Sequence, residues 1–272
     1  MNIRSLLRHY CIRDEISAQV DRIKQPVGSF GYDAWGYHVD ALKIGLSTLK
    51  FFYDNYFRVH TNGIDNIPAT GRVLIIANHS GQVPLDGVLI GSALARREKD
   101  PRAARVMIER FFPTVPFIGN ILNSIGGVVG DPINCSRMLD NEDAVIVFPE
   151  GIRGSSKLYD KRYQLQHFGS GFMRLAVQHN APIVPVGVIG CEEAMPSFYN
   201  IKPLAEMLGL PYAPVTTPIP LPARISLYFG APMSFDFDDA RGEADVTHLV
   251  DTVKDQIRAL INEGLSKRES IF

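Results

Sequence analysis

Cysteine, net charge and long apolar runs are all scarce in this sequence of 272 residues. The three cysteines, Cys11, Cys135 and Cys191, are scattered and lack the paired spacing of a structural zinc site, so no metal is expected. An odd number of isolated cysteines also argues against a disulfide framework and suits a reducing compartment. The N-terminal segment MNIRSLLRHYCIRDE carries charges throughout and lacks the apolar core of a signal peptide. We therefore expect the chain to stay in the cytoplasm.

Long apolar runs are interrupted everywhere, and none reaches the roughly 18 residues that a membrane-spanning helix requires. Two uncharged stretches, 111–130 and 207–223, come close but contain proline, asparagine or threonine, which are unfavourable in lipid. They are interpreted as ordinary core and loop, as the lining of an apolar cavity, or as a surface that touches a membrane.

Positive and negative charges are nearly balanced, with 28 lysines and arginines against 29 acidic residues. The chain has no overall basic field of the kind that attracts nucleic acid, so we expect no nucleic-acid partner. Local basic groups occur at Arg96, Arg97, Lys99, Arg102, Arg105 and Arg110, and again at Lys157, Lys161 and Arg162. Each group is interpreted either as a solvated face or as a contact for phosphates of a cofactor or an anionic lipid.

Strand-like and helix-like patterns alternate from about residue 57 onward. Strands are predicted at 57–61, 73–77, 104–108, 127–129, 144–148, 182–189 and 224–229, and helices at 84–97, 115–124, 134–141, 167–179 and 246–263. Such alternation is typical of an α/β fold, with a mostly parallel central sheet flanked by helices. Because 46% of the residues are hydrophobic, we expect a substantial buried core, either in one large α/β domain or in an α/β domain, 57–272, with a helical extension.

The N-terminal segment 1–56 is predicted to be an amphipathic helical extension, with helices over 1–24 and 33–57. In the second helix the apolar arc is widened by Trp35, Ile44, Phe51, Phe52 and Phe57. This arc either packs on the main domain or lies on a bilayer.

One strand-to-helix turn combines a histidine with an aspartate. The strand Val73–Ala77 is followed by Asn78, His79 and Ser80, and Asp86 lies near the start of the next helix. If Asp86 accepts the proton on one ring nitrogen of His79, the other nitrogen is a base near neutral pH. The pair can meet only if 80–83 form a loop, because two turns of helix would separate the residues by about 10 Å. A purely structural histidine and aspartate is the alternative.

Other polar residues also follow predicted strands. The segment 148–154, FPEGIRG, follows one strand, and Gly190, Cys191, Glu192 and Glu193 follow another. Ligands of open α/β sheets bind beyond the carboxyl ends of the strands, so three strand ends are expected to share one crevice. Glu150 and Arg153 would offer an acceptor and a cation to a polar headgroup there, unless they form only an exposed ion pair.

Four segments in this order, NHS at 78–80, GGVVGDPINC at 126–135, FPEGIRG at 148–154 and PIVPVGV at 182–188, resemble the PlsC-type glycerolipid and lysophospholipid acyltransferases. The resemblance implies transfer of a fatty acyl group from acyl-CoA or acyl carrier protein to the hydroxyl of a glycerolipid or lysophospholipid acceptor. It implies that His79 is the general base and that Asp86 orients it. It further implies that Glu150, Gly151 and Arg153 bind the acceptor headgroup and that Pro185 shapes the pocket wall.

The resemblance also implies a peripheral protein on the cytoplasmic face of the cytoplasmic membrane. The acyl donor is a co-substrate, and no further cofactor is expected.

Two positions depart from the family pattern. Six residues separate His79 from Asp86, where the family usually has four. Pro132 stands where members that accept a phosphorylated glycerol have an arginine, so the acceptor is either such a phosphate or a neutral lipid alcohol such as diacylglycerol.

Two other functions remain open at this stage. A serine lipase or esterase would use a Gly-x-Ser-x-Gly turn, which the sequence lacks, although Ser80 beside His79 is a possible nucleophile. A non-catalytic lipid-binding protein is the second, and the unusual spacing between His79 and Asp86 favours it.

Overall fold

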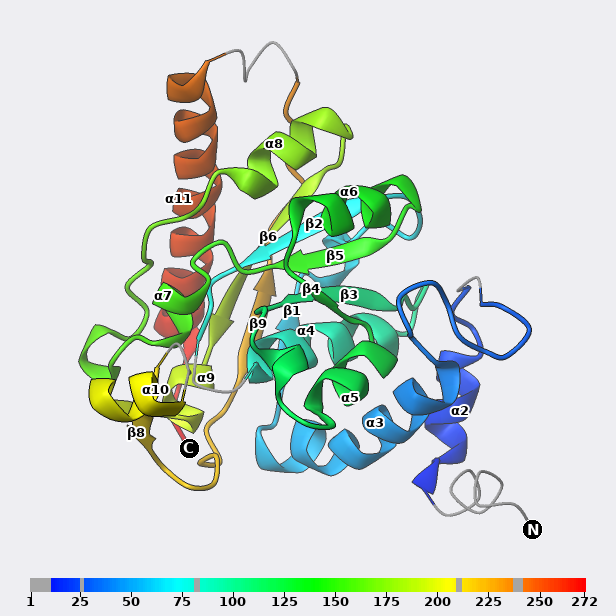
Figure 1. Ribbon diagram of the computed structural model, residues 1–272, viewed down its shortest axis with the longest axis horizontal. Coiled ribbons are helices and arrows are strands. Elements are labelled where there is room, and N and C mark those ends of the chain that lie inside the picture. Colours follow the sequence, from blue (N-terminus) through cyan, green and yellow to red (C-terminus); the bar gives the residue numbers. More distant parts are fainter. Residues whose placement is uncertain (1–10, 25–26, 81–83, 209–211, 237–241) are drawn as a thin grey trace.

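A seven-stranded sheet forms the centre of the protein (Figure 1). The structure, a computed structural model, describes residues 11–24, 27–80, 84–208, 212–236 and 242–272. The strands of the sheet are β1 (His60–Asn62), β2 (Val73–Ala77), β3 (Ala104–Ile108), β4 (Gly127–Val129), β5 (Ala144–Val147), β6 (Ile183–Ile189) and β9 (Ser226–Phe229). Each overlaps a strand that the sequence predicts. The two central strands β2 and β6 are buried along their whole length, as expected of uncharged runs of β-branched residues.

The strand order is β1-β9-β6-β2-β5-β3-β4, and most neighbours are parallel. Strand β2 pairs in parallel with both β5 and β6, which places the chain segments after these three strands at one edge. Strand β9 runs antiparallel to β6, and β1, which pairs in parallel with β9, shares this opposite direction. The predicted fold class, a mostly parallel central sheet flanked by helices, is confirmed.

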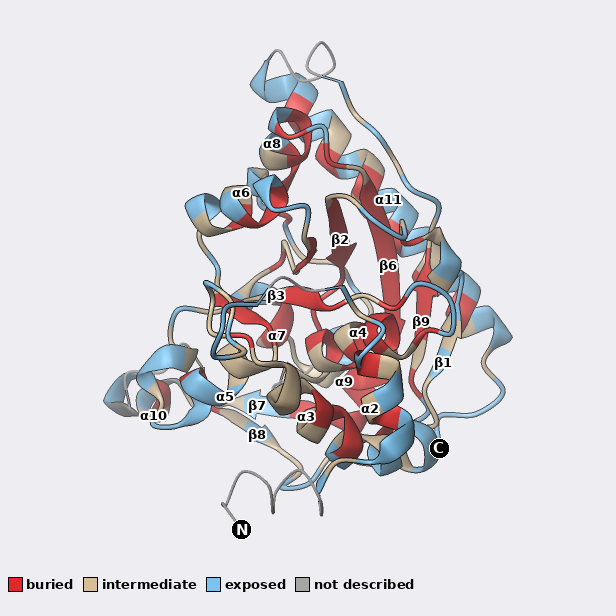
Figure 2. Cartoon of the chain, turned by 90° about the vertical axis from the view of Figure 1, so that its right-hand side faces the viewer, coloured by how far each residue is buried: buried red, intermediate tan, exposed pale blue. Residues whose placement is uncertain are grey.

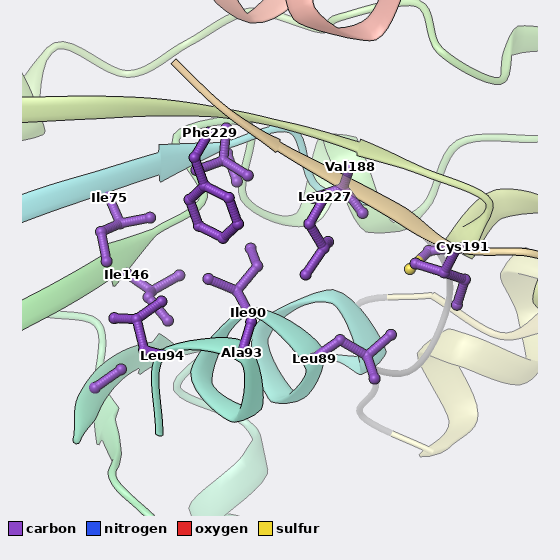
Figure 3. Close-up of a cluster of buried hydrophobic side chains, with 14 of the residues drawn as sticks. Ile75, Leu89, Ile90, Ala93, Leu94, Ile146, Val188, Cys191, Leu227 and Phe229 are labelled. Carbon is purple, nitrogen blue, oxygen red and sulfur yellow. The ribbon is translucent and has the colours of Figure 1, made fainter. Parts of the chain in front are cut away.

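Helices cover both faces of the sheet. The longer ones are α3 (Val39–Phe51), α4 (Leu85–Arg96), α5 (Ile118–Ser124), α6 (Pro132–Asp140), α8 (Gly171–Gln178) and α11 (Glu243–Lys267). Helix α4 packs Leu89, Ile90 and Leu94 against strand residues such as Ile75 and Phe229 (Figure 3). On the other face α6, α8 and α11 pack against the alternate strand residues, as period-2 alternation requires. The central strands β2 and β6 are therefore buried between two helical layers, whereas the edge strand β1 is largely exposed (Figure 2).

Helix α11 lies unusually close to the sheet. A Cβ atom added to Gly187 of β6 would lie 3.0 Å from the backbone nitrogen of Ile261, and one added to Gly264 would lie 2.6 Å from Cδ1 of Ile189. Glycine on both surfaces therefore allows the long last helix to contact β6 along its length.

The second N-terminal helix begins later than the sequence predicts. Helix α3 starts at Val39, and a π-helical turn, η1 (Phe52–Tyr56), extends it. Residues 33–38 form a loop because the Asp33 carboxylate accepts hydrogen bonds from the backbone of Trp35 and Tyr37 and pairs with the Arg105 guanidinium. Arg105 is 1% exposed, so it does not belong to the solvated basic face that the sequence suggests.

The N-terminal helices pack on α4, one of the helices that cover the sheet. Ile16 and Val20 of α2 (Asp14–Val20) and Leu46 of α3 form a small cluster with Ala95 of α4. Residues 1–10 of the predicted first helix lie outside the described residues. The proposed division of the chain at residue 57 stays a prediction.

The remaining short elements were not predicted. They are α7 (Ile152–Ser155), α9 (Cys191–Ala194), α10 (Lys202–Leu208), the antiparallel strands β7 (Ser197–Asn200) and β8 (Pro214–Thr216), and the 3-10 turns η2 (Ile64–Asn66), η3 (Phe112–Thr114) and η4 (Tyr159–Lys161). Among the helices described, none is both long enough and apolar enough to cross a bilayer.

Candidate active site

The candidate site lies where β6, β2 and β5 end side by side. His79 follows β2, Glu150 follows β5 and Glu192 follows β6. The strand order places these three strand ends at one edge of the sheet, because adjacent parallel strands end at the same side. Residues 190–193 after β6 are not among the described residues that line the cavity at His79, so the predicted shared crevice stays a prediction.

His79 and Asp86 are in contact. Nδ1 of His79 lies 2.7 Å from Oδ2 of Asp86, which also accepts the backbone N–H of Ser80 at 2.9 Å. The other carboxylate oxygen accepts the backbone N–H of Gly87 at 2.8 Å, and Asp86 is completely buried. These donors hold the carboxylate in place, so it keeps the Nδ1 proton of the imidazole and leaves Nε2 as the basic nitrogen. Nε2 has no hydrogen-bond partner in the described part of the chain.

The wide spacing between the two residues does not prevent their contact. Helix α4 begins only at Leu85, with Pro84 before it, so Asp86 lies in the first helical turn and not two turns beyond His79. Residues 81–83 lie outside the described residues.

The His79 ring faces a cavity of about 250 Å³. It stacks on Phe148 with ring centroids 4.6 Å apart, and 11% of its side chain is exposed. Apolar side chains form most of the cavity wall. They include Val106, Met107, Ile108, Phe112, Val147, Phe148, Phe172 and Leu175.

The surroundings of His79 favour its protonated form. Burial by itself would lower the pKa of His79, but the carboxylates of Asp86, Glu150 and Glu109 outweigh this and raise the pKa above its ordinary value. A base with a raised pKa holds a proton more strongly once it has taken one. The site can therefore stabilise the imidazolium that forms when an alcohol loses its proton.

Glu150 is buried, and both of its carboxylate oxygens are occupied. Oε1 accepts the backbone N–H of His79 at 2.9 Å, and Oε2 accepts that of Gln166 at 2.7 Å. The side chain thus ties the loop after β5 to the histidine turn. Its predicted contact with an acceptor headgroup stays a prediction.

The other predicted binding residues lie apart from the His79 ring. Gly151 has a φ of 53° and begins the turn into α7, and Arg153 is exposed. Pro185 lies inside β6, where a Cβ atom on Gly230 would lie 2.8 Å from its Cγ. None of the three is among the described residues that line the cavity at His79.

A buried cluster of charges lies behind Glu150. Nζ of Lys157 lies 3.6 Å from Oε2 of Glu150 and 2.9 Å from Oε1 of Glu192. Arg268, just beyond α11, pairs with Glu193 at 2.9 Å. The sequence placed Lys157 on a solvated face or against phosphates, but only 4% of its side chain is exposed. It serves as the counter-charge for two buried carboxylates.

Two acidic residues of the cavity wall were not singled out from the sequence. Glu109 and Asp131 both line the cavity with His79. Asp131 pairs with the exposed Arg110 at 3.0 Å. No sequence signal marked Glu109, because its place in the wall depends on the position of β3 in the sheet.

A second, larger cavity adjoins the first. Its volume is about 410 Å³, and it shares Pro84, Val106 and Ile108 with the cavity at His79. The wall comes from α3, α4, β3 and α5, and almost all of it is apolar. The uncharged stretch 111–130 contributes to both cavities, as one of its three interpretations predicts.

The described residues contain no group of three or more His, Cys, Asp or Glu side chains that could hold a metal ion.

Comparisons with known proteins agree with the motifs. Residues 58–189, which include all four motif segments, match the Acyltransferase family model. An uncharacterized protein of Mycobacterium tuberculosis is 33% identical over 259 residues, covering 90% of this chain and 71% of that protein. An uncharacterized protein of Mycobacterium leprae is 34% identical over 238 residues, covering 82% of this chain and 65% of that protein.

The fold has a solved counterpart. The crystal structure of the 1-acyl-sn-glycerophosphate (LPA) acyltransferase PlsC from Thermotoga maritima matches with a TM-score of 0.58 and 18% identity, covering 97% of this chain and 88% of that one. The resemblance to PlsC-type enzymes, which the order of the motifs predicted, is confirmed in family and in fold. The chain belongs to the acyltransferase family, and its enzyme class is that of the O-acyltransferases.

Proposed function

We propose that this protein transfers a fatty acyl group from an acyl thioester, acyl-CoA or acyl carrier protein, to the hydroxyl of a glycerolipid or lysophospholipid acceptor. The observation that carries this proposal is the contact of 2.7 Å between His79 and Asp86 at the wall of an apolar cavity. Acyl transfer to a lipid requires a base that removes the proton from the acceptor hydroxyl and an apolar cavity that holds the lipid.

The chemistry follows from the orientation of the ring. Nε2 of His79 takes the proton of the acceptor hydroxyl while the oxygen attacks the thioester carbonyl carbon. The carbon–sulfur bond then breaks, and the thiolate leaves with the proton that the imidazolium returns. Asp86 keeps Nδ1 protonated throughout, so the attacking alcohol always meets the basic nitrogen. No covalent acyl-enzyme and no cofactor beyond the acyl donor are needed.

The larger cavity is suited to the acyl chain. It is apolar, it adjoins the His79 cavity through Pro84, Val106 and Ile108, and it extends between α3 and α4. Burying a methylene chain there would contribute about 0.8 kcal/mol for each CH₂ removed from water.

The burial of Ser80 argues against a serine hydrolase. Ser80 is completely buried and does not belong to the described wall of the cavity. The backbone N–H of Ser80 donates a hydrogen bond to Asp86. The Ser80 hydroxyl would have to move before it could attack a substrate.

We place the protein peripherally on a membrane, on its cytoplasmic face, with the membrane surface as a partner. Exposed aromatic and aliphatic side chains lie at the end of α3 and at α5, two helices that line the larger cavity, and Phe52 among them lines the cavity itself. They are Phe51, Phe52, Phe117, Ile118 and Ile121. An apolar group of this kind beside a lipid cavity favours contact with a bilayer surface.

Release of free thiol tests the proposed reaction. Purified protein with a long-chain acyl thioester and a lipid alcohol is expected to release thiol and form an ester, each only when both substrates are present. An acetyl thioester is expected to react much more slowly, because it leaves the large cavity empty. Failure to release thiol with any lipid alcohol would favour the non-catalytic lipid-binding protein instead.

Binding to vesicles tests the membrane surface. The double variant Phe51→Ser and Phe52→Ser is expected to sediment less with phospholipid vesicles, because each change removes an exposed aromatic ring. The matched control is Tyr199→Ser, which removes an exposed ring from β7. Equal sedimentation of the double variant and the unaltered protein would remove this face from the proposal.

A further inference from the structure

Apart from His79, the described wall of the cavity contains acidic groups but no basic ones. It includes Glu109 and Asp131, yet no lysine or arginine. Asp131 is neutralised by Arg110, whose own side chain is 74% exposed. Glu109 has no ion pair or hydrogen bond to its carboxylate within the described ranges, and its Oε1 would lie 3.4 Å from a Cβ atom added to Gly151. Glu109 therefore places a carboxylate without a lysine or arginine partner in the same cavity wall as His79.

The helix N-terminus that follows Asp131 in the cavity wall offers little to an anion. Helix α6 starts at Pro132, which has no N–H, and the N–H of Ile133 already donates to Oδ1 of Asp131 at 2.9 Å. Backbone N–H groups at a helix start are a common phosphate site, and here the first two are absent or occupied. The start of α8, at Gly171 and Phe172, also lines the cavity. Its dipole amounts to about half an elementary charge, less than the full charge of Glu109.

We propose that the acceptor is an uncharged lipid alcohol and that Glu109 is the residue that selects against acceptors carrying a phosphomonoester. This inference rests on the proposed acyl transfer and specifies its substrate class. In a lysophosphatidic acid the phosphate is on the carbon next to the reacting one, so it must enter the same cavity as the hydroxyl. Its charge of about −1.5 to −2 would then meet the half-buried carboxylate of Glu109 within one cavity. A monoacylglycerol places only a hydroxyl there, which can donate a hydrogen bond to Glu109.

Two acceptors that differ only in the phosphate test this inference. The full-length protein is assayed for thiol release and ester formation with one acyl thioester and either a monoacylglycerol or the lysophosphatidic acid with the same acyl chain, in the same detergent. We expect kcat/KM to be about tenfold or more higher for the monoacylglycerol, the effect of about 1.4 kcal/mol. The opposite preference would overturn the inference while leaving acyl transfer in place. Inactivity with both acceptors and with other lipid alcohols would count against the proposed function itself.

Variants of the wall separate the role of Glu109 from general effects. Glu109→Gln is expected to reduce the preference about tenfold, chiefly by raising kcat/KM for lysophosphatidic acid. This change also lowers the pKa of His79, but that affects both acceptors equally and cancels in the ratio. Pro132→Arg supplies a cation from the same wall and is expected to shift the ratio in the same direction. The control is Glu98→Gln, an exposed acid at the far end of α4, which is expected to leave the ratio unchanged. An unchanged ratio in Glu109→Gln would show that Glu109 does not select the acceptor, whatever the ratio in Pro132→Arg.

Discussion

Replacing His79 with alanine is expected to lower kcat/KM for acyl transfer by about 100- to 10,000-fold, the usual contribution of a general base. The reason is that no other described side chain of the cavity wall offers a basic nitrogen near neutral pH. Thiol release from the acyl donor, measured with the acceptor present, gives the rate. Circular dichroism and thermal unfolding establish that the variant folds.

A second buried histidine provides the matched control. His179 is hydrogen-bonded to Ser136 at 2.8 Å and lies near Asp140, but it is not part of the described cavity wall. His179→Ala is expected to retain the rate of acyl transfer. Comparable losses in the His79 and His179 variants would mean that the His79 effect comes from folding and not from chemistry.

The pH dependence of His79 adds an independent measurement. The free enzyme needs the neutral imidazole, so kcat/KM falls as the pH drops through the pKa of His79. Burial lowers this pKa, but Asp86, Glu150 and Glu109 raise it by more, so the acid limb is expected above the ordinary value of 6.5. Asp86→Asn removes the largest of the raising effects and should move the limb to lower pH.

Replacing Lys157 with methionine is expected to lower the free energy of unfolding by about 3–5 kcal/mol, as is usual when one partner of a buried ion pair is removed. The Lys157 side chain is 4% exposed, and those of Glu150 and Glu192 are 0% and 7% exposed. Without the ammonium group, two buried carboxylates would face each other uncompensated. Urea unfolding at neutral pH measures the loss.

The pH dependence of the stability lost in Lys157→Met gives a further test. Burial raises the pKa of Glu192, and Lys157 opposes this, so its removal should raise the pKa further. When folding raises the pKa of a carboxyl group, the folded protein becomes less stable as the pH rises above the ordinary pKa of that group, here 4.5. The destabilisation should therefore shrink on acidification.

The double variant Lys157→Met and Glu192→Gln should recover part of the stability, because it removes one of the two carboxylates. A loss below about 1 kcal/mol, the range of solvated pairs, would contradict this account of the cluster.

Several elements could be predicted because their signals are local. Strand β2 is a run of five apolar residues, and β6 is a similar uncharged run, so both had to be buried strands. The turn after β2 could be identified because a polar Asn-His-Ser follows such a strand directly. The predicted start of the helix at residue 33 was wrong because Asp33 pairs with Arg105, which is 72 positions away in the sequence. Helical periodicity cannot detect a partner that distant.

The residues of the candidate site also fall into those with a local sequence signal and those without one. His79, Asp86 and Glu150 could be identified from short motifs. Glu109 and Lys157 could not, because a lone charged residue carries no mark of whether it will be solvated or buried. The antiparallel direction of β9 was equally unmarked, since strand patterns are the same for both directions.

The sequence by itself determined the α/β class, the positions of the sheet strands and the histidine turn at the end of β2, because apolar periodicity and turn chemistry act over a few residues. Only the tertiary structure decided that Asp86 contacts His79 despite the six residues between them, that Lys157 is buried between two carboxylates, and that Glu109 lines the cavity at His79. The physical reason is that the environment of a charge is set by segments far away in the chain, which only the folded sheet brings together.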